Sequence, residues 1–237
     1  MIGSMKTLQI LKQEIIVCRK CPRLVEFREH IAQVKRRAYR ECDYWGKPVP
    51  GFGDPKASVL LIGLAPGAHG ANRTGRVFTG DRSGEFLYRA MYETGFASQP
   101  ASTSREDGLK LFNAYISAAV RCVPPDNKPL PDEIRNCRPF LERELDLLKK
   151  VRVVIALGRL AFDAYLTILQ DQSKISRRSQ FVFGHDVEHR TGEEQPLLIS
   201  SYHPSQQNTS TGKLTEEMLR RIFLRARKRI TSLPLQP

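Results

Sequence analysis

The chain has 237 residues, of which 41% are hydrophobic and 27% charged, which excludes a mostly disordered protein. This length predicts one large domain or two small ones, and since no composition break marks a boundary, we expect a single domain over residues 1–237. The net charge of +13 indicates either a polyanionic partner, most commonly nucleic acid, or a basic surface without a specific partner.

Neither a membrane span nor a secretory signal is visible in the sequence. No window of about 18 apolar residues occurs, and the N-terminal stretch lacks the apolar region of a signal peptide. We therefore expect no membrane partner and a cytoplasmic location.

Strand and helix patterns alternate along the chain. Short apolar runs bounded by turn residues predict buried strands at residues 58–64, 114–120, 152–157 and 196–202. Helical patterns lie at residues 83–94, with Ser83 as the expected N-cap, and at 132–149, 158–169 and 214–230. This alternation predicts an α/β fold, a parallel sheet with helices on both sides, whose ligands lie at the carboxyl ends of the strands.

Two segments show little pattern. Residues 97–108 read as a polar, mobile loop, and residues 170–195 as a charged stretch with a hairpin near 181–187.

The loop after the first predicted strand combines residue types that suit a nucleotide pocket. Six glycines between positions 63 and 84 let the backbone approach a ligand closely, although the loop is neither a Walker loop nor G-x-G-x-x-G. It also carries an aromatic ring, a carboxylate, an imidazole and three guanidinium groups: Phe78, Asp81, His69, Arg73, Arg76 and Arg82. The alternative is a glycine-rich surface loop without a ligand.

The loop after the last predicted strand begins with His203, at a position where a catalytic histidine is as reasonable as a structural one. Its polar tip, which includes Ser205, Gln206 and Asn208, is either an ordinary turn or a wedge that enters a base stack, with Lys213 at a phosphate. The arginine-rich final helix is either a solvated face or a DNA contact.

Four of the five cysteines have the spacing of a metal site. Cys18 and Cys21 form a C-x-x-C pair, and Cys122 and Cys137 flank a proline-rich turn. Four thiolates suit zinc or an iron–sulfur cluster, and the spacing does not choose between them. Cys137 could instead be a plain core residue. We expect Cys42 to be free.

Three segments together resemble the motifs of family-five (UDGb-type) uracil-DNA glycosylases: GLAPGAHGANRTGRVFTGDRSG, AAVRCVPPDNKPLPDEIRNC and HPSQQNTSTGKLT. The resemblance covers the chain from Cys18 to about Thr215. The related family-four enzymes have an acidic residue where this chain has Leu64, and the water-activating aspartate of the classical enzymes falls at Ala65. Both departures are features of family five, and they leave the usual catalytic carboxylate missing.

The resemblance implies a three-layer α/β/α sandwich with a four-stranded parallel sheet. It implies a structural [4Fe–4S] cluster on Cys18, Cys21, Cys122 and Cys137. It also implies that the protein flips uracil and other deaminated bases such as hypoxanthine out of DNA and hydrolyses the N-glycosidic bond. Separately from the resemblance, we expect a monomer. No lysine stands out as a Schiff-base nucleophile, so we expect an abasic site and no lyase step.

Roles for individual residues follow from the same resemblance. Phe78 would stack on the extruded base, backbone groups at Leu64, Ala65 and Gly67 would face its carbonyl, and His69 would lie near the pocket. Arg73 and Arg76, with the polar tip and Lys213, would hold the DNA.

His203 would donate a hydrogen bond to the leaving base anion. Asp81 is the first choice for orienting water or stabilising the sugar cation, with Asn127 as the second. The alternatives are a helix-terminal charge for Asp81 and turn chemistry for Asn127.

Two rival functions are a nucleic-acid-binding protein with a structural zinc and a phosphoesterase that uses the glycine-rich loop. The chain lacks the carboxylate cluster that would hold paired metals, which disfavours the second.

Overall fold

A six-stranded mixed sheet forms the centre of the molecule in the computed structural model, which describes residues 2–232. Its strand order is β1-β3-β2-β4-β6-β5. The four central strands are parallel and completely buried: β3 (Ala114–Ala118), β2 (Val59–Gly63), β4 (Val153–Leu157) and β6 (Leu197–Ser201). The predicted strands and their parallel arrangement are therefore confirmed.

The sheet also has two short antiparallel edge strands that the sequence did not reveal. β1 (Phe52–Gly53) pairs with β3, and β5 (Val187–His189) pairs with β6. The expected four-stranded sheet thus corresponds to the parallel centre of a larger one. The hairpin predicted near 181–187 is displaced, because the strand begins at Val187 and its partner is β6 rather than a neighbouring segment.

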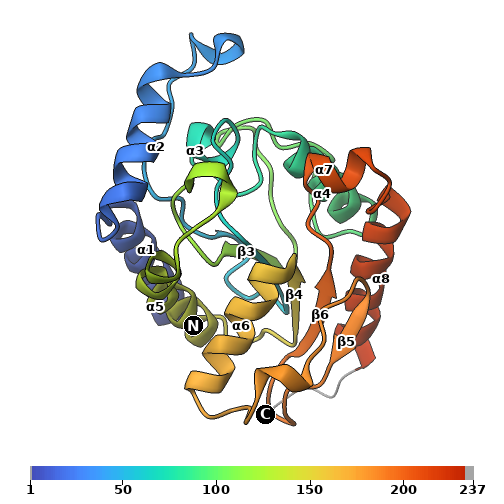
Figure 1. The fold of residues 1–237 in the computed structure, drawn as a ribbon. Helices are drawn as coiled ribbons and strands as arrows, with labels where there is room; N and C mark the ends of the chain where they lie inside the picture. The colour runs from blue at the N-terminus through green and yellow to red at the C-terminus, as the bar shows by residue number, and fades with distance from the viewer. Residues whose placement is uncertain (1, 233–237) are drawn as a thin grey trace.

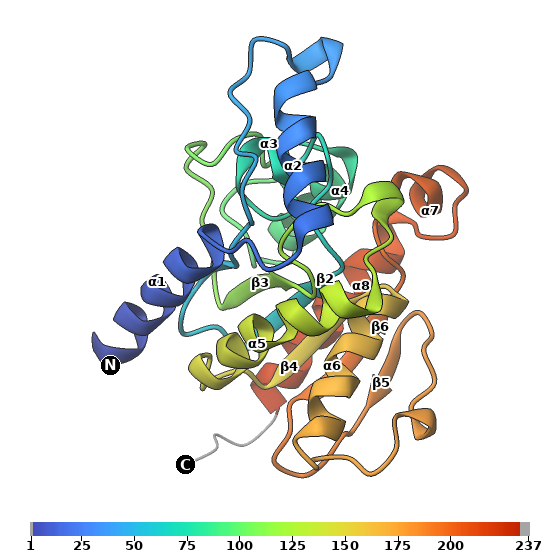
Figure 2. The ribbon, with the colours of Figure 1, turned by 60° about the vertical axis from the view of Figure 1, so that its left-hand side comes forward.

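Helices cover both faces of the sheet, which makes the fold a three-layer α/β/α sandwich (Figures 1 and 2). The helices are α1 (Ile2–Ile16), α2 (Pro22–Val34), α3 (Ala71–Thr74), α4 (Arg82–Glu93), α5 (Pro131–Leu147), α6 (Arg159–Asp171), α7 (Gln206–Ser210) and α8 (Glu216–Ser232). Short 3-10 turns occur at η1 (Arg37–Tyr39), η2 (Pro125–Asn127) and η3 (Arg178–Gln180).

Alternation along each strand divides the core into two layers. On β2, Val59 and Leu61 face one layer, whereas Leu60 and Ile62 face the other. The first layer is closed by apolar side chains of α4 and α8, among them Leu87, Met91, Ile222 and Phe223. The second is closed by α5 and α6, through Leu141, Phe162 and Tyr165. Each strand is apolar on both faces for this reason.

The N-cap of helix α4 lies two residues earlier than predicted. Asp81, not Ser83, is the N-cap, since its side chain accepts a hydrogen bond from the Gly84 N–H. The other three predicted helices agree with α5, α6 and α8 to within about two residues at each end.

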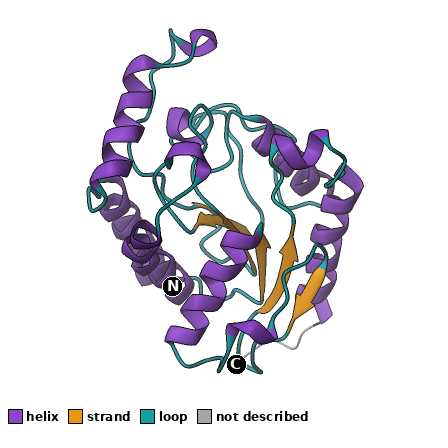
Figure 3. Ribbon diagram, viewed as in Figure 1, coloured by secondary structure: helices purple, strands orange, loops and turns teal. Residues whose placement is uncertain are grey.

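The segments that follow the parallel strands gather at one edge of the sheet, where α3 and α7 also lie (Figure 3). Helix α2 extends past this edge (Figures 1 and 2). The described residues include no helix with the length and apolarity needed to cross a membrane. The carboxyl edge, as the rule for parallel sheets predicts, is where the candidate site is assembled.

Candidate active site

The loop between β2 and α4 is fastened across the carboxyl edge by one of its own arginines. The guanidinium of Arg73 donates from Nε to the His69 carbonyl (2.7 Å) and from Nη2 to the Gly80 carbonyl (2.9 Å). These bonds join the two halves of the loop, so Arg73 has a structural role whether or not it also contacts DNA.

Phe78 and His203, predicted from two distant loops, lie against each other. Their ring centroids are 5.7 Å apart, and the ring planes make an angle of 30°. Phe78 lies over the end of β2, where a Cβ added to Gly63 would be only 2.9 Å from Phe78 Cε2. Glycine at the strand end therefore allows the ring to occupy this place.

His203 is held by its backbone and leaves its ring available. Its carbonyl accepts a hydrogen bond from Asn208 Nδ2 (2.9 Å), and no described residue bonds to either ring nitrogen. Burial lowers the pKa of His203 to about 4. The imidazole is therefore neutral at pH 7 and can donate through one N–H and accept through the other nitrogen.

Asp81 lies under the loop as well as at the start of α4. Besides capping the helix, its Oδ2 is so close to the loop backbone that a Cβ added to Gly70 would lie 2.0 Å away, and one added to Gly67 2.9 Å away. Burial raises the pKa of Asp81, opposed by the hydrogen bond from Gly84. The structure thus supports the alternative that Asp81 is a charge at the N-terminus of a helix. It also shows the carboxylate against the backbone of the predicted base-binding loop.

The backbone of this loop is anchored by its carbonyl groups. The Leu64 carbonyl accepts from the Val120 N–H (2.9 Å), and the Gly67 carbonyl accepts from the Asn72 N–H (3.0 Å). The side chain of Ala65 packs against the group that contains Cys122 and Cys137.

His69 points toward the segment after α2. Its Nδ1 lies 3.0 Å from the hydroxyl of Tyr44, and the two rings meet edge to face. Burial and the nearby charges of Arg36 and Arg73 lower the pKa of His69. Tyr44 was not predicted from the sequence. The only sequence feature that could have indicated it is its position shortly after the basic residues 35–40.

Asn127 is exposed in η2. Its φ is +56°, and its N–H donates to the Pro124 carbonyl (3.2 Å). These features match the turn alternative, and no contact joins its side chain to Phe78 or Asp81.

The polar tip predicted after the last strand forms α7. Ser205 caps this short helix by accepting from the Asn208 N–H, and Gln206 is exposed on it. Lys213 is exposed, with Nζ 4.8 Å from the centre of the Tyr202 ring. The polar tip is therefore a short helical turn with exposed polar groups.

The basic residues of α8 mainly hold the fold together. Arg225 pairs with Asp186 (2.8 Å), and Arg229 pairs with Glu188 (2.8 Å). These pairs join α8 to the edge segment that contains β5, so both guanidinium groups are engaged within the fold, a role that neither sequence-based alternative described.

Arg76 contradicts the expectation that it contacts DNA. Only 3% of its side chain is exposed, and its Nη2 donates to Asp107 Oδ2 (2.6 Å) and Ser102 Oγ (2.6 Å). The segment 97–108, predicted as a mobile loop, is therefore folded around a buried guanidinium. A buried, paired cation is not available to a phosphate.

Three of the four predicted ligand cysteines pack together, and an arginine links the fourth to them. Cys21 packs with the buried Cys122 and Cys137. Arg28 connects Cys18 to this group, because its Nη1 donates to the Cys18 carbonyl (3.2 Å) and to Cys122 Sγ (3.0 Å). Cys42 belongs to neither packing group of the other cysteines.

Other N–H groups also point at the sulfur atoms. Cys137 Sγ accepts from the Arg121 N–H (3.5 Å), and Cys21 Sγ accepts from Asn136 Nδ2 (3.6 Å). Burial raises the pKa of Cys122 to about 11 and that of Cys137 to about 12. Among residues 2–232, no three histidine, cysteine or acidic side chains are arranged to hold a single metal ion.

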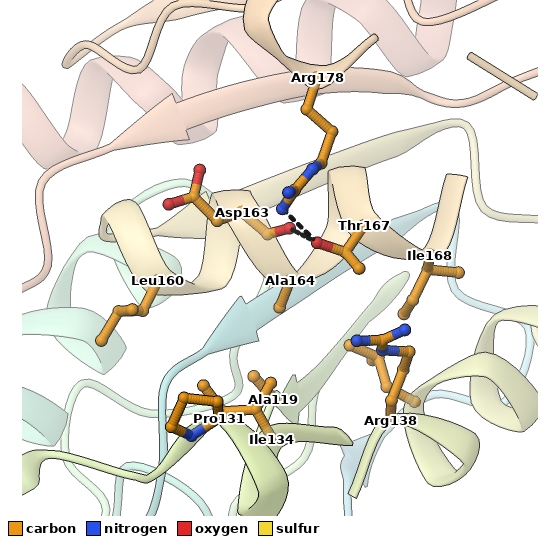
Figure 4. A pocket seen from close by; sticks show the side chains of 11 residues that line it. Ala119, Pro131, Ile134, Arg138, Leu160, Asp163, Ala164, Thr167, Ile168 and Arg178 are labelled. Carbon is orange, nitrogen blue, oxygen red and sulfur yellow. Dashed lines mark hydrogen bonds between the residues drawn. The ribbon is translucent and has the colours of Figure 1, made fainter. Parts of the chain in front are cut away.

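A cavity of about 280 Å³ lies away from these residues, between α5 and α6 (Figure 4). Arg178 closes one side of the cavity by donating a hydrogen bond to Thr167 Oγ1 (2.7 Å). Thr167 and Asp163, which also lines the cavity, both lie on α6. None of the residues predicted for the site lines this cavity.

Comparison with known proteins shows the family to which the chain belongs. The family model of the Uracil DNA glycosylase superfamily matches residues 50–227, and the chain belongs to this superfamily. Within it, the chain is 49% identical to the Type-5 uracil-DNA glycosylase of Thermus thermophilus over 91% of this chain and 95% of that protein. It is 41% identical to the Type-5 enzyme of Pyrobaculum aerophilum over 90% and 88% of the two chains.

Identity to a Type-4 uracil-DNA glycosylase of Sulfurisphaera tokodaii is 28%, over 92% of this chain and 84% of that protein. The expectation of a hydrolytic DNA glycosylase is confirmed at the level of the family.

Proposed function

We propose that the protein excises uracil, and other deaminated bases such as hypoxanthine, from DNA by hydrolysis and leaves an abasic site without cutting the strand. The observation that carries this proposal is the contact between Phe78 and His203. It puts a stacking surface and a hydrogen-bonding imidazole at one place on the carboxyl edge.

The geometry of that contact supports a specific pose for the base. Stacked carbon atoms touch at about 3.5–4 Å, and a centroid separation of 5.7 Å fits an imidazole that is displaced sideways over the Phe78 ring. Phe78 is only partly buried. An extruded base would stack on its ring beside the imidazole, edge to edge, rather than between the two rings.

His203 would act as a neutral donor in the chemical step. Cleavage of the glycosidic bond leaves negative charge on the departing base, and an N–H aimed at a base oxygen stabilises this charge as it develops. Such donors contribute about 3–4 kcal/mol. The lowered pKa of His203 supports this role, because a neutral imidazole is present throughout the physiological range.

Asp81 would orient the attacking water or stabilise the cationic sugar. Its carboxylate belongs to the same loop as Phe78, and the two glycines beside it let that carboxylate lie directly against the loop backbone. Asn127 stays the second candidate for holding water or the base.

The loop backbone at Leu64, Ala65 and Gly67 would meet the base carbonyl. Arg73, Ser205, Gln206, Asn208 and Lys213 are proposed to contact the DNA. The exposure of Gln206 and Lys213 supports this assignment, whereas Arg76 is withdrawn from it.

Cys18, Cys21, Cys122 and Cys137 would hold a [4Fe–4S] cluster, which ties the N-terminal segment to the turn after β3 when bound. Two observations support the fit: N–H groups point at three of the sulfurs, and a buried guanidinium, Arg28, balances the negative charge of thiolate ligands.

The DNA substrate supports a cytoplasmic location for the enzyme, and we propose that it works as a monomer with a single domain. The function is tested with an end-labelled duplex that contains one uracil, incubated with the protein and then treated with alkali. We expect strand breaks at the uracil only after alkali. Breaks without alkali would show a lyase step, and no breaks in either case would refute uracil excision.

The same duplex with hypoxanthine in place of uracil tests the wider substrate range. An otherwise identical duplex with thymine is the matched control and should stay intact. Purified protein should be brown, with broad visible absorbance that a zinc protein lacks.

A further inference from the structure

A protruding segment with concentrated positive charge follows α2. We call residues 35–44 the basic arm; it contains Lys35, Arg36, Arg37 and Arg40, as well as two acidic residues, Glu41 and Asp43. The distal end of α2 extends past the carboxyl edge of the sheet, on the opposite side of that edge from α7 (Figures 1 and 2). The arm therefore stands beside the place where an extruded base would enter.

The three arginines of the arm have no acidic partner. Arg36, Arg37 and Arg40 are exposed, and none of them makes an ion pair with a residue that the structure describes. Some arginines elsewhere pair with carboxylates, as Arg143 does with Glu14 and Arg159 with Asp163. The exposed Arg82, Arg177, Arg190 and Arg221 resemble the arm, since they make no ion pair with a described residue. Exposed cations without partners are available to phosphate oxygens.

Side chains fix the arm to the candidate site. The Tyr44 hydroxyl accepts from the Arg36 N–H (3.4 Å) and bonds to His69 Nδ1 (3.0 Å). The guanidinium of Arg73 lies 4.1 Å from the centre of the Tyr39 ring. Both His69 and Arg73 belong to the loop that carries Phe78.

Backbone bonds hold the base of the arm. The N–H groups of Trp45 and Gly46 donate to the carbonyls of Arg73 (2.8 Å) and Asn72 (3.0 Å). The arm is thus positioned relative to the pocket rather than being a free tail.

We propose that the basic arm binds the phosphate backbone of double-stranded DNA beside the extruded nucleotide. With α7 on one side of the pocket and the arm on the other, the DNA is held on both flanks of the lesion. Because backbone phosphates carry no sequence, this grip acts on undamaged DNA as well. The inference rests on the proposed function for the place of the lesion, but the grip itself can be measured without catalysis.

The test is the salt dependence of binding to a duplex that contains no uracil, measured by fluorescence anisotropy with the full-length protein. Each phosphate contact contributes about 0.9 to the slope of log K against log salt. The triple variant R36Q/R37Q/R40Q should therefore lower the slope by about 2 to 3. The matched control is K149Q/K150Q/K174Q, which removes three exposed charges beside the starts of the strands, at the opposite edge.

We expect the control slope to change by less than about 1. If the salt slope falls equally in the two triple variants, the arm acts only through the net charge of the protein, which contradicts the proposal. An unchanged slope in the arm variant would also refute the proposal. Should the triple variant lose its folded circular dichroism spectrum, the single charge reversal R37E serves instead, and it must weaken binding more than K150E does.

A second experiment separates the arm from the pocket. Uracil release by the wild-type protein tests the proposed function, and the slope on undamaged DNA tests the arm. A protein that releases no uracil but shows the arm-dependent slope would refute only the function. If the protein releases uracil but the arm variant has the same salt slope for DNA binding as the wild type, only this inference is refuted.

Discussion

Phe78 and His203 reach each other from loops that follow two different strands, β2 and β6, with β4 between these strands in the sheet. The offset contact of their rings depends on the parallel arrangement, since only then do both strands end at the same edge. Every role proposed for the pocket depends on this pair.

Replacing Phe78 by leucine removes the stacking surface and retains apolar bulk. Stacking on an aromatic ring contributes about 1–3 kcal/mol per base, so we expect KM for uracil-containing DNA to rise by about ten-fold or more. The matched control is Phe112→Leu, which changes a half-exposed phenylalanine in the segment before β3. Steady-state kinetics that show equal effects for both variants would contradict the stacking role.

Replacing His203 by glutamine should lower kcat by about a hundred-fold to a thousand-fold, the usual loss for one donor to a developing anion. DNA affinity, measured on a substrate that is not cleaved, should change little. Equal losses of affinity and rate would instead make His203 a structural residue.

The pKa of His203 also predicts how stability changes with pH. The unfolded chain has an ordinary imidazole with a pKa near ~6.5, and the folded chain has one at about 4, so between these values only the unfolded state binds the proton. Unfolding free energy should therefore fall as the pH drops from about 6.5 to 4, by at most about 3 kcal/mol. Denaturant titrations of wild type and His203→Gln measure the difference, and identical pH profiles would be the contrary result.

Asp81 can be separated into its capping and chemical roles with two variants. Asparagine caps a helix about as well as aspartate, so Asp81→Asn should leave the melting temperature nearly unchanged and lower kcat strongly. Asp81→Ala should lower kcat and in addition cost about 1 kcal/mol of stability. An Asp81→Asn enzyme with nearly normal kcat would show that the residue is only a cap.

Asp107 should be important for stability and irrelevant for DNA contact. Burial alone would raise the pKa of Asp107, but the hydrogen bond from Arg76 and the bonds from backbone N–H groups hold it below the usual range. Asp107→Asn leaves the Arg76 guanidinium buried without a counter-charge, which should cost about 3–5 kcal/mol. The salt slope for DNA binding should equal that of the wild type. A clearly smaller slope would indicate that Arg76 contacts DNA after all.

Cys122→Ser should release iron and lower the melting temperature, because one thiolate of the cluster and the bond to Arg28 are both lost. Iron content, visible absorbance and thermal melting give three independent measurements. The control is Cys42→Ser, which changes the cysteine outside the group and should leave all three unaltered. Equal iron content in the two variants would contradict the proposed ligand set.

The central strands could be predicted because they are buried on both faces and read as continuous apolar runs. The edge strands could not, because segments as short as Phe52–Gly53 carry no pattern of their own. The start of α4 was misplaced because Asp81 and Ser83 are both good caps, and only the backbone decides which one accepts the hydrogen bond.

The candidate site was predictable where position along a strand determined it. Phe78 and His203 follow strand ends, and the rule for parallel sheets brings such residues together. Arg76 was misjudged because its sequence neighbourhood resembles that of Arg73, and nothing local reveals that Asp107 folds over it. Other contacts between residues distant in sequence, such as that of Arg28 with Cys122, could not be predicted for the same reason.

Ala65 has a place in two structures at once. Its backbone belongs to the loop proposed to receive the base, and its methyl group packs against the cysteines. The proposed base-binding loop and the surroundings of the cysteines therefore share one piece of chain. We expect oxidation of these thiols to disturb base binding even when the residues proposed to contact DNA are unchanged.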